Sequence, residues 1–360
     1  MGNTVREFMT HWDDPAPIWF ERDEDELVGT QRSGGRPMPR IRMADLFRGY
    51  TNAPGSQPVL VWKGKDAFIE AHYVYGPEAT FHRPSDYDVL IFQYTGHAGI
   101  ETEMGEFQIG TGHCLHIPAG VAYRVIGGTE CRQMVVKLRK PVQPKVDPQN
   151  PYTETEFAAQ IDGTAVNGQP VAFPARQGKI LEVTEFFGGV LEPIVIERDH
   201  ARLVGAATAQ RGRDISVTRI FDYFTGMTGK GTARAPLHYE GQDFRTDAYN
   251  TEGQQNGFHR GADDDELWFQ FRGHALNETE WGNHELDPLE MGYVPRGIAH
   301  RITGGDGFLR FVLYFRHPMF PQADESSQHG HARVEMRTTS TKELPALAEA
   351  RAKAPAPRSA

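Results

Sequence analysis

The chain has 360 residues, which is enough for two domains of ordinary size that each bury their own core. Its formal net charge is −10 and no run of basic residues appears, which argues against a nucleic-acid binder. Two cysteines and no CxxC pair argue against a disulfide framework or a thiolate metal site. No signal-like segment follows Met1 and no apolar run could span a membrane, so we expect a cytoplasmic protein without a membrane partner.

Composition shifts along the chain divide it into four parts. Residues 1–55 predict an irregular arm over the first domain, because prolines and a Ser-Gly-Gly turn interrupt them. Residues 56–150 predict a first β-rich domain, and residues 151–325 predict a linker followed by a second one. Residues 326–360 are polar and end in an Ala/Pro-rich stretch, so we expect a flexible tail.

An internal repeat is the most specific feature of the sequence. Residues 81–128 and 258–305 align without a gap at an offset of 177 residues. Both copies share an FHR start, an F-Q-x-x-G-H-A block, E-T-E-x-G, a P-x-G turn and a final G-G. Each copy holds short apolar and aromatic runs that end at glycine, which is typical of strands. The repeat therefore predicts an all-β chain made by duplication of one domain.

The second copy carries metal-ligating residue types at a recognisable spacing. Cupin domains, which are jelly-roll β-barrels, place a His, a second His two residues later, a Glu seven residues after the first His, and a distal His beyond a P-x-G turn. His259, Glu266 and His300 occupy three of these positions, and Gly261 replaces the second His. Side chains on a strand alternate between faces, so such spacing can direct several of them into one barrel. We predict a bicupin, two tandem cupin barrels, with a metal site at His259, Glu266 and His300.

The first copy serves as an internal comparison for this site. His82 aligns with His259, but Val89 and Tyr123 stand where the carboxylate and the distal His would be. We therefore expect the first barrel to hold no metal. Asp265 competes with Glu266 as a ligand, but neighbouring strand residues face opposite ways, and its counterpart in the metal-free copy indicates a structural role.

The donor set indicates the kind of chemistry. Two imidazoles and one carboxylate leave coordination positions open for a substrate and O₂, as in non-haem Fe(II) oxygenases. The same donors also suit Mn, Zn or Ni, so these metals stay as alternatives to Fe(II).

The chain also resembles homogentisate 1,2-dioxygenases and the large subunit of hydroquinone 1,2-dioxygenases. In the first copy the resemblance lies in Ser85-Asp86-x-Asp88, Gln93-x-x-Gly96, residues 100–107 and Ile117-Pro118-x-Gly120. In the second it lies in His259-Arg260, Glu266-Leu267 and Arg272-Gly273. The resemblance implies a bicupin with Fe(II) in the C-terminal barrel that cleaves the ring of a para-dihydroxylated aromatic with O₂. The implied ligands are again His259, Glu266 and His300.

Further residues are candidates for roles around the metal. Proton transfer could involve three polar side chains, His238, Tyr239 and His284. Substrate contacts could come from Trp268 and Gln270, which share the strand face of Glu266, and from Arg260, which could orient a carboxylate.

Two other classes of function remain open at this point. A metal-dependent isomerase or lyase would use the same ligands. A non-catalytic binding or storage bicupin is disfavoured because one barrel keeps its ligands. We expect a homo-oligomer that takes an aromatic diol and O₂, and a small second subunit is a further possibility.

Overall fold

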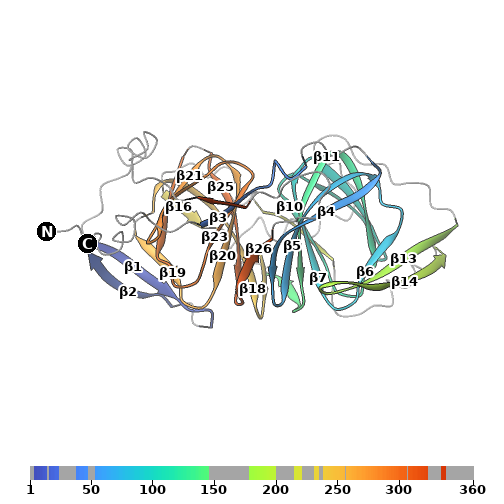
Figure 1. The fold of residues 1–360 in the computed structure, drawn as a ribbon, viewed down its shortest axis with the longest axis horizontal. Coiled ribbons are helices and arrows are strands. Elements are labelled where there is room, and N and C mark those ends of the chain that lie inside the picture. Colours follow the sequence, from blue (N-terminus) through green and yellow to red (C-terminus); the bar gives the residue numbers. More distant parts are fainter. Residues whose placement is uncertain are drawn as a thin grey trace.

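The computed structural model describes residues 4–13, 16–23, 38–47, 53–145, 178–199, 215–220, 231–234, 238–255, 257–305, 307–322 and 334–337. Every regular element in these ranges is a β-strand, and the strands form two largely antiparallel barrels that lie side by side (Figure 1). The predicted all-β, jelly-roll bicupin fold is confirmed. In the described part of the chain no helix offers the length and apolarity needed to cross a membrane.

Each barrel is one hydrogen-bonded sheet. The N-terminal barrel consists of β4 (Gly55–Gly64), β5 (Ala67–Pro77), β6 (Phe81–Pro84), β7 (Asp88–Thr95), β8 (His97–Thr102), β9 (Gly105–Gly110), β10 (His113–Ile117), β11 (Tyr123–Leu138), β13 (Lys179–Phe186), β14 (Gly189–Asp199), β15 (Ser216–Arg219) and β26 (Met319–Pro321). The C-terminal barrel consists of β1 (Thr4–Thr10), β2 (Ile18–Asp23), β3 (Met38–Arg42), β12 (Val142–Pro144), β16 (Gly231–Arg234), β17 (Tyr239–Gly241), β18 (Phe244–Gln254), β19 (Phe258–Gly261), β20 (Asp265–Arg272), β21 (Ala275–Thr279), β22 (Gly282–Leu286), β23 (Glu290–Val294), β24 (His300–Gly304), β25 (Leu309–Phe315) and β27 (Val334–Arg337).

The strands where the barrels meet are buried on both faces. On β7, Val89 and Ile91 pack in the interior of the N-terminal barrel, whereas Leu90 and Phe92 pack in the core between the barrels. There the ring of Phe92 lies 5.5 Å from that of Phe269 on β20. Period-2 alternation thus sends one set of side chains inward and the other against the neighbouring barrel. This explains why these strands read as continuous apolar runs.

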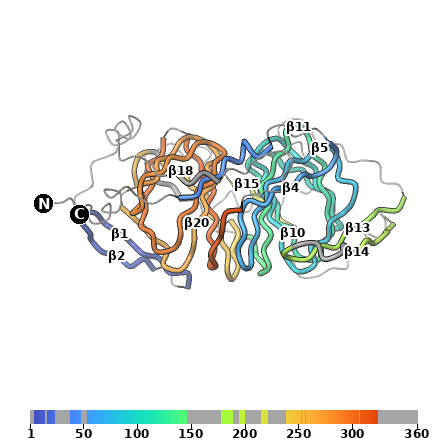
Figure 2. The backbone as a smooth tube through the Cα atoms, viewed as in Figure 1, coloured from blue at the N-terminus to red at the C-terminus, as the bar shows by residue number. Residues whose placement is uncertain are grey.

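The two halves of the chain exchange strands. The β1–β2 hairpin and β3 belong to the C-terminal barrel, where β1 runs parallel to β19 and β3 pairs with β23. Conversely, the β13–β14 hairpin and β15 belong to the N-terminal barrel, where β13 runs parallel to β6 and β15 pairs with β10. Figure 2 displays the exchange by colour, with the dark blue hairpin against the orange barrel and the yellow-green hairpin against the cyan one.

The exchange is reciprocal residue by residue. Arg40 pairs with Gly292, and Val217 pairs with Leu115, so both partners are related by the offset of 177 found in the sequence repeat. The strands at the barrel junction obey the same relation, since β12 pairs with β17 and β26 pairs with β4. The duplicated unit is therefore longer than the segment in which sequence identity is visible.

Buried ion pairs hold each exchanged hairpin in place. Glu7 on β1 is fully buried and accepts hydrogen bonds from Arg260 on β19 and from Arg22 at 3.1 Å. Glu182 on β13 is equally buried and pairs with Arg83 on β6 and with Arg198. A buried carboxylate that lost these partners would be strongly destabilising, so the pairs oppose detachment of the hairpins.

Three expectations about organisation need correction. The N-terminal arm is not irregular where it is described, and its strands lie on the second barrel rather than the first. Residues 178–199, expected in the linker of the second domain, lie on the first barrel. Val334–Arg337, expected in a flexible tail, pairs with β3. Pairing between strands about 250 residues apart leaves no local signal, which is why the sequence pattern missed it. The remaining parts of the arm, linker and tail lie outside the described residues.

The exchange predicts that neither half folds alone. A polypeptide of residues 1–145 lacks β13–β15, and one of residues 178–360 lacks β1–β3, so each leaves the edge strands of its barrel unpaired. Refolded together, the two should form a complex with one copy of each and native-like near-UV circular dichroism. Light scattering after gel filtration would measure the stoichiometry. Cooperative unfolding of either half as an isolated monomer would contradict this prediction.

Candidate metal centre

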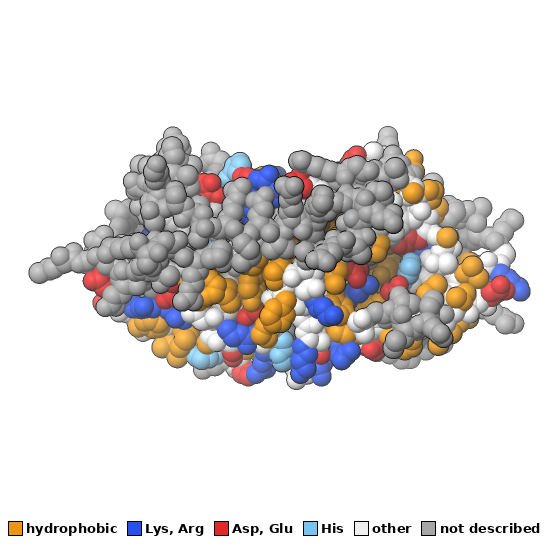
Figure 3. Space-filling model, in the orientation of Figure 1, with side chains coloured by type: hydrophobic (Ala, Val, Ile, Leu, Met, Phe, Trp, Pro, Cys, Tyr) orange, Lys and Arg blue, Asp and Glu red, His pale blue; other side chains and the backbone are white. Residues whose placement is uncertain are grey.

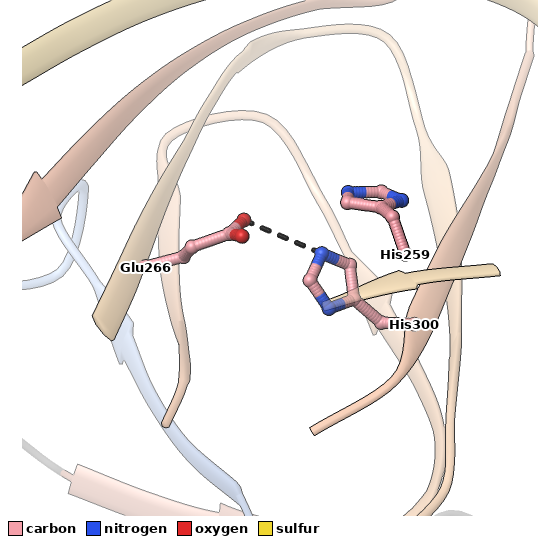
Figure 4. A group of neighbouring side chains, drawn as sticks. All are labelled: His259, Glu266 and His300. Atoms are coloured by element: carbon pink, nitrogen blue, oxygen red, sulfur yellow. Dashed lines mark ion pairs between the residues drawn. The ribbon is translucent and has the colours of Figure 1, made fainter. Parts of the chain in front are cut away.

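The three predicted ligands converge inside the C-terminal barrel. His259 on β19 stands directly opposite His300 on β24, and Glu266 enters from β20. Their candidate ligand atoms all lie within 4.8 Å of one another, and the three side chains point toward a common centre (Figure 4). The predicted convergence is therefore confirmed, whereas metal binding at this position stays a prediction.

The backbone sets the tautomer of His300. Its Nδ1 lies 3.0 Å from the carbonyl oxygen of Ile298, which can only accept, so Nδ1 carries the proton. Nε2 is then left with its lone pair, buried and 3.3 Å from Oε2 of Glu266, and it takes part in no hydrogen bond with the described residues. A ring nitrogen oriented in this way by a bond at the opposite nitrogen is the form that ligates metals.

Glu266 is held as a carboxylate. Burial alone would raise its pKa, but the neighbouring imidazoles of His300 and His259 and the indole N–H of Trp268, which donates to Oε2 at 3.0 Å, together lower that pKa to about 2. An ionised carboxylate beside an unprotonated ring nitrogen is a donor set suited to a divalent cation.

Aromatic rings pack around the cluster from both halves of the chain. Trp268 lies edge-on to His300 with ring centroids 5.1 Å apart. Phe8, on the exchanged strand β1, stacks on His259 at 5.3 Å with an interplanar angle of 14°. Sequence reasoning missed Phe8 because its contact depends on the strand exchange. The first residues of the chain therefore complete the wall of a site whose ligands lie near its other end.

Space for the second His of the cupin pattern is already taken. A Cβ atom at Gly261 would overlap the carboxylate oxygen Oδ1 of Asp264, so a larger side chain does not fit there. The other oxygen of Asp264 binds Arg245 at 3.1 Å. Burial first, and then the charge of Glu266, raise the pKa of Asp264 to about 6. Asp264 is a polar neighbour of the centre that sequence reasoning did not identify.

Asp265 is structural, as expected from its counterpart Asp88. Its carboxylate accepts hydrogen bonds from the backbone of Arg296 at 3.1 Å and of Met319 at 3.3 Å. Asp88 accepts equivalent bonds from the backbone of Ala119 and Val142, both at 3.0 Å. Each aspartate thus ties the P-x-G turn to the strand that crosses to the other barrel. The glycines of these turns, Gly120 and Gly297, have φ angles of 86° and 77°, which other residues rarely adopt.

Two predicted substrate contacts are occupied elsewhere. All three donor groups of Arg260 are bound, to Glu7, to Glu280 at 2.9 Å and to the carbonyl oxygen of Gly297 at 2.9 Å. Arg83 makes the equivalent contacts in the other barrel, so the substrate role of Arg260 is corrected to a structural one.

Gln270 points into the barrel as predicted, but its amide is saturated. Its nitrogen donates to the carbonyl oxygen of Arg272 at 2.8 Å, and its oxygen accepts from Arg310 at 3.0 and 3.1 Å. Arg310 is fully buried, and it lies 4.7 Å from the ring of Trp268. Gln270 therefore orients the guanidinium that supports Trp268, and the structure gives no indication of a direct substrate contact.

The three predicted proton handlers lie in different places. Tyr239 packs in the core between the barrels, and its hydroxyl donates to the carbonyl oxygen of Cys114 at 3.2 Å, which places it away from the centre. His238 precedes it at the barrel junction, where its backbone N–H donates to Thr246 at 3.1 Å and its carbonyl accepts from Lys145. Burial lowers the pKa of His238 to about 4.

His284 is the predicted proton handler that shares a cavity with a residue of the centre. It lines a space of about 40 Å³ together with Trp268, Asn277 and Met38. Burial lowers the pKa of His284 to about 4, so the ring is neutral near pH 7. Its Nε2 is buried and has no hydrogen-bond partner among the described residues.

The N-terminal barrel lacks the triad at the same positions. Tyr123 stands opposite His82 just as His300 stands opposite His259. Val89 replaces the carboxylate and is fully buried.

A second cluster that sequence reasoning missed lies where the barrels meet. There His317 Nε2 is 3.5 Å from Asp66 and 3.9 Å from Asp243. Four cationic side chains, Lys65, Arg139, Lys140 and Arg316, line the adjoining surface pocket, which makes this cluster less suited to a cation than the first.

No protein-family model matches the sequence, and no curated protein matches it. Among solved structures, the chain is similar to a cupin 2 conserved barrel domain protein from Leptotrichia buccalis, with 10% identity, a TM-score of 0.45, and 77% of this chain and 95% of that chain covered. It is also similar to a deletion mutant of Bacillus subtilis oxalate decarboxylase, with 12% identity, a TM-score of 0.44, and 86% and 88% covered. The fold assignment itself stands on the strand pairing described above.

The placement of Arg260 predicts a loss of stability on its removal. Arg260→Met leaves Glu7 without its principal partner, and Arg83→Met does the same to Glu182 in the other barrel. Each variant should lower the free energy of unfolding by about 3 kcal/mol, the usual effect of breaking a buried ion pair. Urea denaturation would measure it. An unchanged midpoint for Arg260→Met, with a lowered one for Arg83→Met, would restore a role for Arg260 outside structure.

Burial of His284 predicts a pH dependence of stability. The ring must stay neutral in the fold while the unfolded chain takes up a proton, so stability present above pH 6.5 is lost as pH falls toward 4. His284→Asn should reduce that loss by about 3 kcal/mol. Denaturation at several pH values would test this, with exposed His274→Asn as the control. Equal pH dependence in wild type and His284→Asn would rule the assignment out.

Proposed function

We propose that the protein is a mononuclear non-haem iron dioxygenase that cleaves the ring of a para-dihydroxylated aromatic. The observation that carries the proposal is the convergence of His259, Glu266 and His300 to within 4.8 Å inside one barrel. Two imidazoles and one carboxylate bind a divalent metal and leave positions open for other ligands. The likeness of the sequence motifs to ring-cleaving bicupin dioxygenases supports the choice of reaction.

The residues present fit a metal ion. His300 presents a buried ring nitrogen whose lone pair faces the carboxylate of Glu266, and Glu266 is held ionised. The crowding of Asp264 against Gly261 leaves no room for a fourth ligand at that position, which favours an open centre over a closed structural one. Iron(II) would supply electron transfer between a bound diol and O₂.

The walls of the site suit an aromatic ring. Trp268, Tyr314 and Tyr249 belong to the interior cluster of the C-terminal barrel, with Trp12, Trp281 and Ile298 packed against it. Such a lining binds flat apolar ligands and excludes water from the centre.

Two side chains near the centre have roles in this proposal. Trp268 orients Glu266 through its indole N–H and separates the centre from the cavity of His284. His284, neutral and with an open ring nitrogen, is the group placed to accept the proton of the distal substrate hydroxyl.

The decisive experiment measures metal content and oxygen consumption together. The full chain, purified anaerobically and supplied with Fe(II), should bind about one metal per chain and consume O₂ with hydroquinone or homogentisate. Metal binding without O₂ uptake on any aromatic diol would favour a metal-dependent isomerase or lyase. Failure to retain metal would exclude an enzyme of either kind at this centre.

Paired substitutions locate the site within the chain. His300→Ala should abolish both metal binding and O₂ consumption, because it removes one of three donors. Tyr123→Ala, at the equivalent position of the N-terminal barrel, should leave metal content unchanged. Elemental analysis of both variants gives the answer. Loss of metal in Tyr123→Ala, with retention in His300→Ala, would place the site in the wrong barrel.

A further inference from the structure

The N-terminal barrel contains a cavity of about 540 Å³, far larger than the space beside the candidate metal centre. In the space-filling view the surface over this barrel is hollowed between hydrophobic, acidic and histidine side chains (Figure 3). A volume of this size is typical of small-molecule sites in proteins. The metal-free barrel is therefore not a filled structural partner of the other one.

One wall of the cavity is a chain of hydrogen-bonded polar groups. Ser56 lies 2.8 Å from Nδ1 of His72, whose Nε2 lies 2.8 Å from Glu70. Glu70 in turn binds the ammonium of Lys137 at 3.0 and 3.1 Å. Lys137 and His72 are both largely shielded from bulk solvent and both line the cavity.

The chain of polar groups continues on the far side of Lys137. Glu185, brought in by the exchanged strand β13, lies 3.8 Å from Lys137 and accepts hydrogen bonds from Tyr87 at 2.6 Å and from His82 at 2.9 Å. The other ring nitrogen of His82 faces Glu78 at 3.7 Å. Strand exchange thus supplies a residue to this interior, as it supplies Phe8 to the other.

The charges in this wall do not cancel. Burial opposes ionisation of Glu70 and Glu185, but their cationic neighbours lower the pKa of each to about 2. Burial likewise opposes a charge on His82, but Glu185 and Glu78 raise its pKa. Three carboxylates therefore face two cations, Lys137 and His82, and one negative charge remains. A cavity with this balance disfavours anions and favours ligands that donate hydrogen bonds.

The equivalent wall of the C-terminal barrel is built differently. At the offset of 177, Lys137 and His72 correspond to Tyr314 and Tyr249, whose hydroxyls lie 2.8 Å apart. The Lys137 network is therefore not a remnant of the candidate metal centre. A set of buried charges is costly to maintain, and one that lines an open cavity is characteristic of a functional site.

We propose that the N-terminal barrel is a second, metal-independent binding site for a neutral small molecule with hydroxyl groups on a ring. Lys137 has an N–H beyond those directed at Glu70, and Glu78 offers an acceptor, so a hydroxyl group can both accept and donate here. The opposite wall is apolar and matches the face of a ring; it is formed by Leu60, Ile91, Val125 and Val135. This site does not depend on the proposed function of the C-terminal barrel.

Calorimetric titration of the full chain after treatment with a chelator tests the proposal. Hydroquinone, under anaerobic conditions, represents an aromatic hydroxylated ring, and myo-inositol represents an alicyclic one. At least one should bind with one site per chain, and the one that binds identifies the kind of ring. Gentisate, which adds a carboxylate to the ring of hydroquinone, should bind at least tenfold more weakly than the neutral compound that binds.

Variants assign the binding to one barrel. Lys137→Met removes the ammonium, and Leu60→Trp fills the mouth of the cavity at a partly exposed position that tolerates a larger side chain. Either variant that keeps a native near-UV spectrum should bind at least tenfold more weakly, while His300→Ala should bind as wild type does. The proposal is overturned by no saturable binding of either neutral compound at about 10 mM, by tighter binding of gentisate, or by binding that His300→Ala abolishes. Because no metal is needed, the result is separate from that of the dioxygenase test.

Discussion

The reciprocal exchange of strands is the constraint on which both barrels depend. Each barrel is closed by strands from the opposite half of the chain, and a buried glutamate, Glu7 or Glu182, pairs with an arginine of the barrel that receives it. Because these carboxylates are fully buried, their ion pairs make the position of each hairpin specific. The interior of each barrel then contains a side chain from the exchanged strand, Phe8 in one and Glu185 in the other.

The duplicated barrels share a scaffold and have diverged inside it. Residues that hold the frame are retained in both copies: Arg83 and Arg260 bind the exchanged strands, and Asp88 and Asp265 bind the P-x-G turns. Residues that face the interior differ, since Val89 and Tyr123 stand where Glu266 and His300 stand in the other copy. A repeated fold can therefore carry two different sites, because strand alternation separates the frame from the interior.

Local patterns predicted the features that depend on local geometry. The spacing of His259 and Glu266 on neighbouring strands, and of His300 beyond a P-x-G turn, was enough to predict that they meet. Alternation correctly placed Trp268 and Gln270 on the face of Glu266. It could not reveal that the amide of Gln270 is already saturated by Arg310, because that depends on a strand 40 residues away. The Lys137 network was missed for a similar reason, since its members come from strands that no repeat or motif connects.

Strand exchange also has a consequence for the order in which the molecule is made. The first 47 residues leave the ribosome early, but β1 and β3 pair with strands that end at residues 261 and 294. At ordinary rates of synthesis, those partners follow on the order of 10 to 50 s later. The apolar side chains of β1 and β2, among them Trp19, have no barrel to pack on during that interval. The N-terminal segment is thus the part of the nascent chain most exposed to aggregation or to capture by a chaperone.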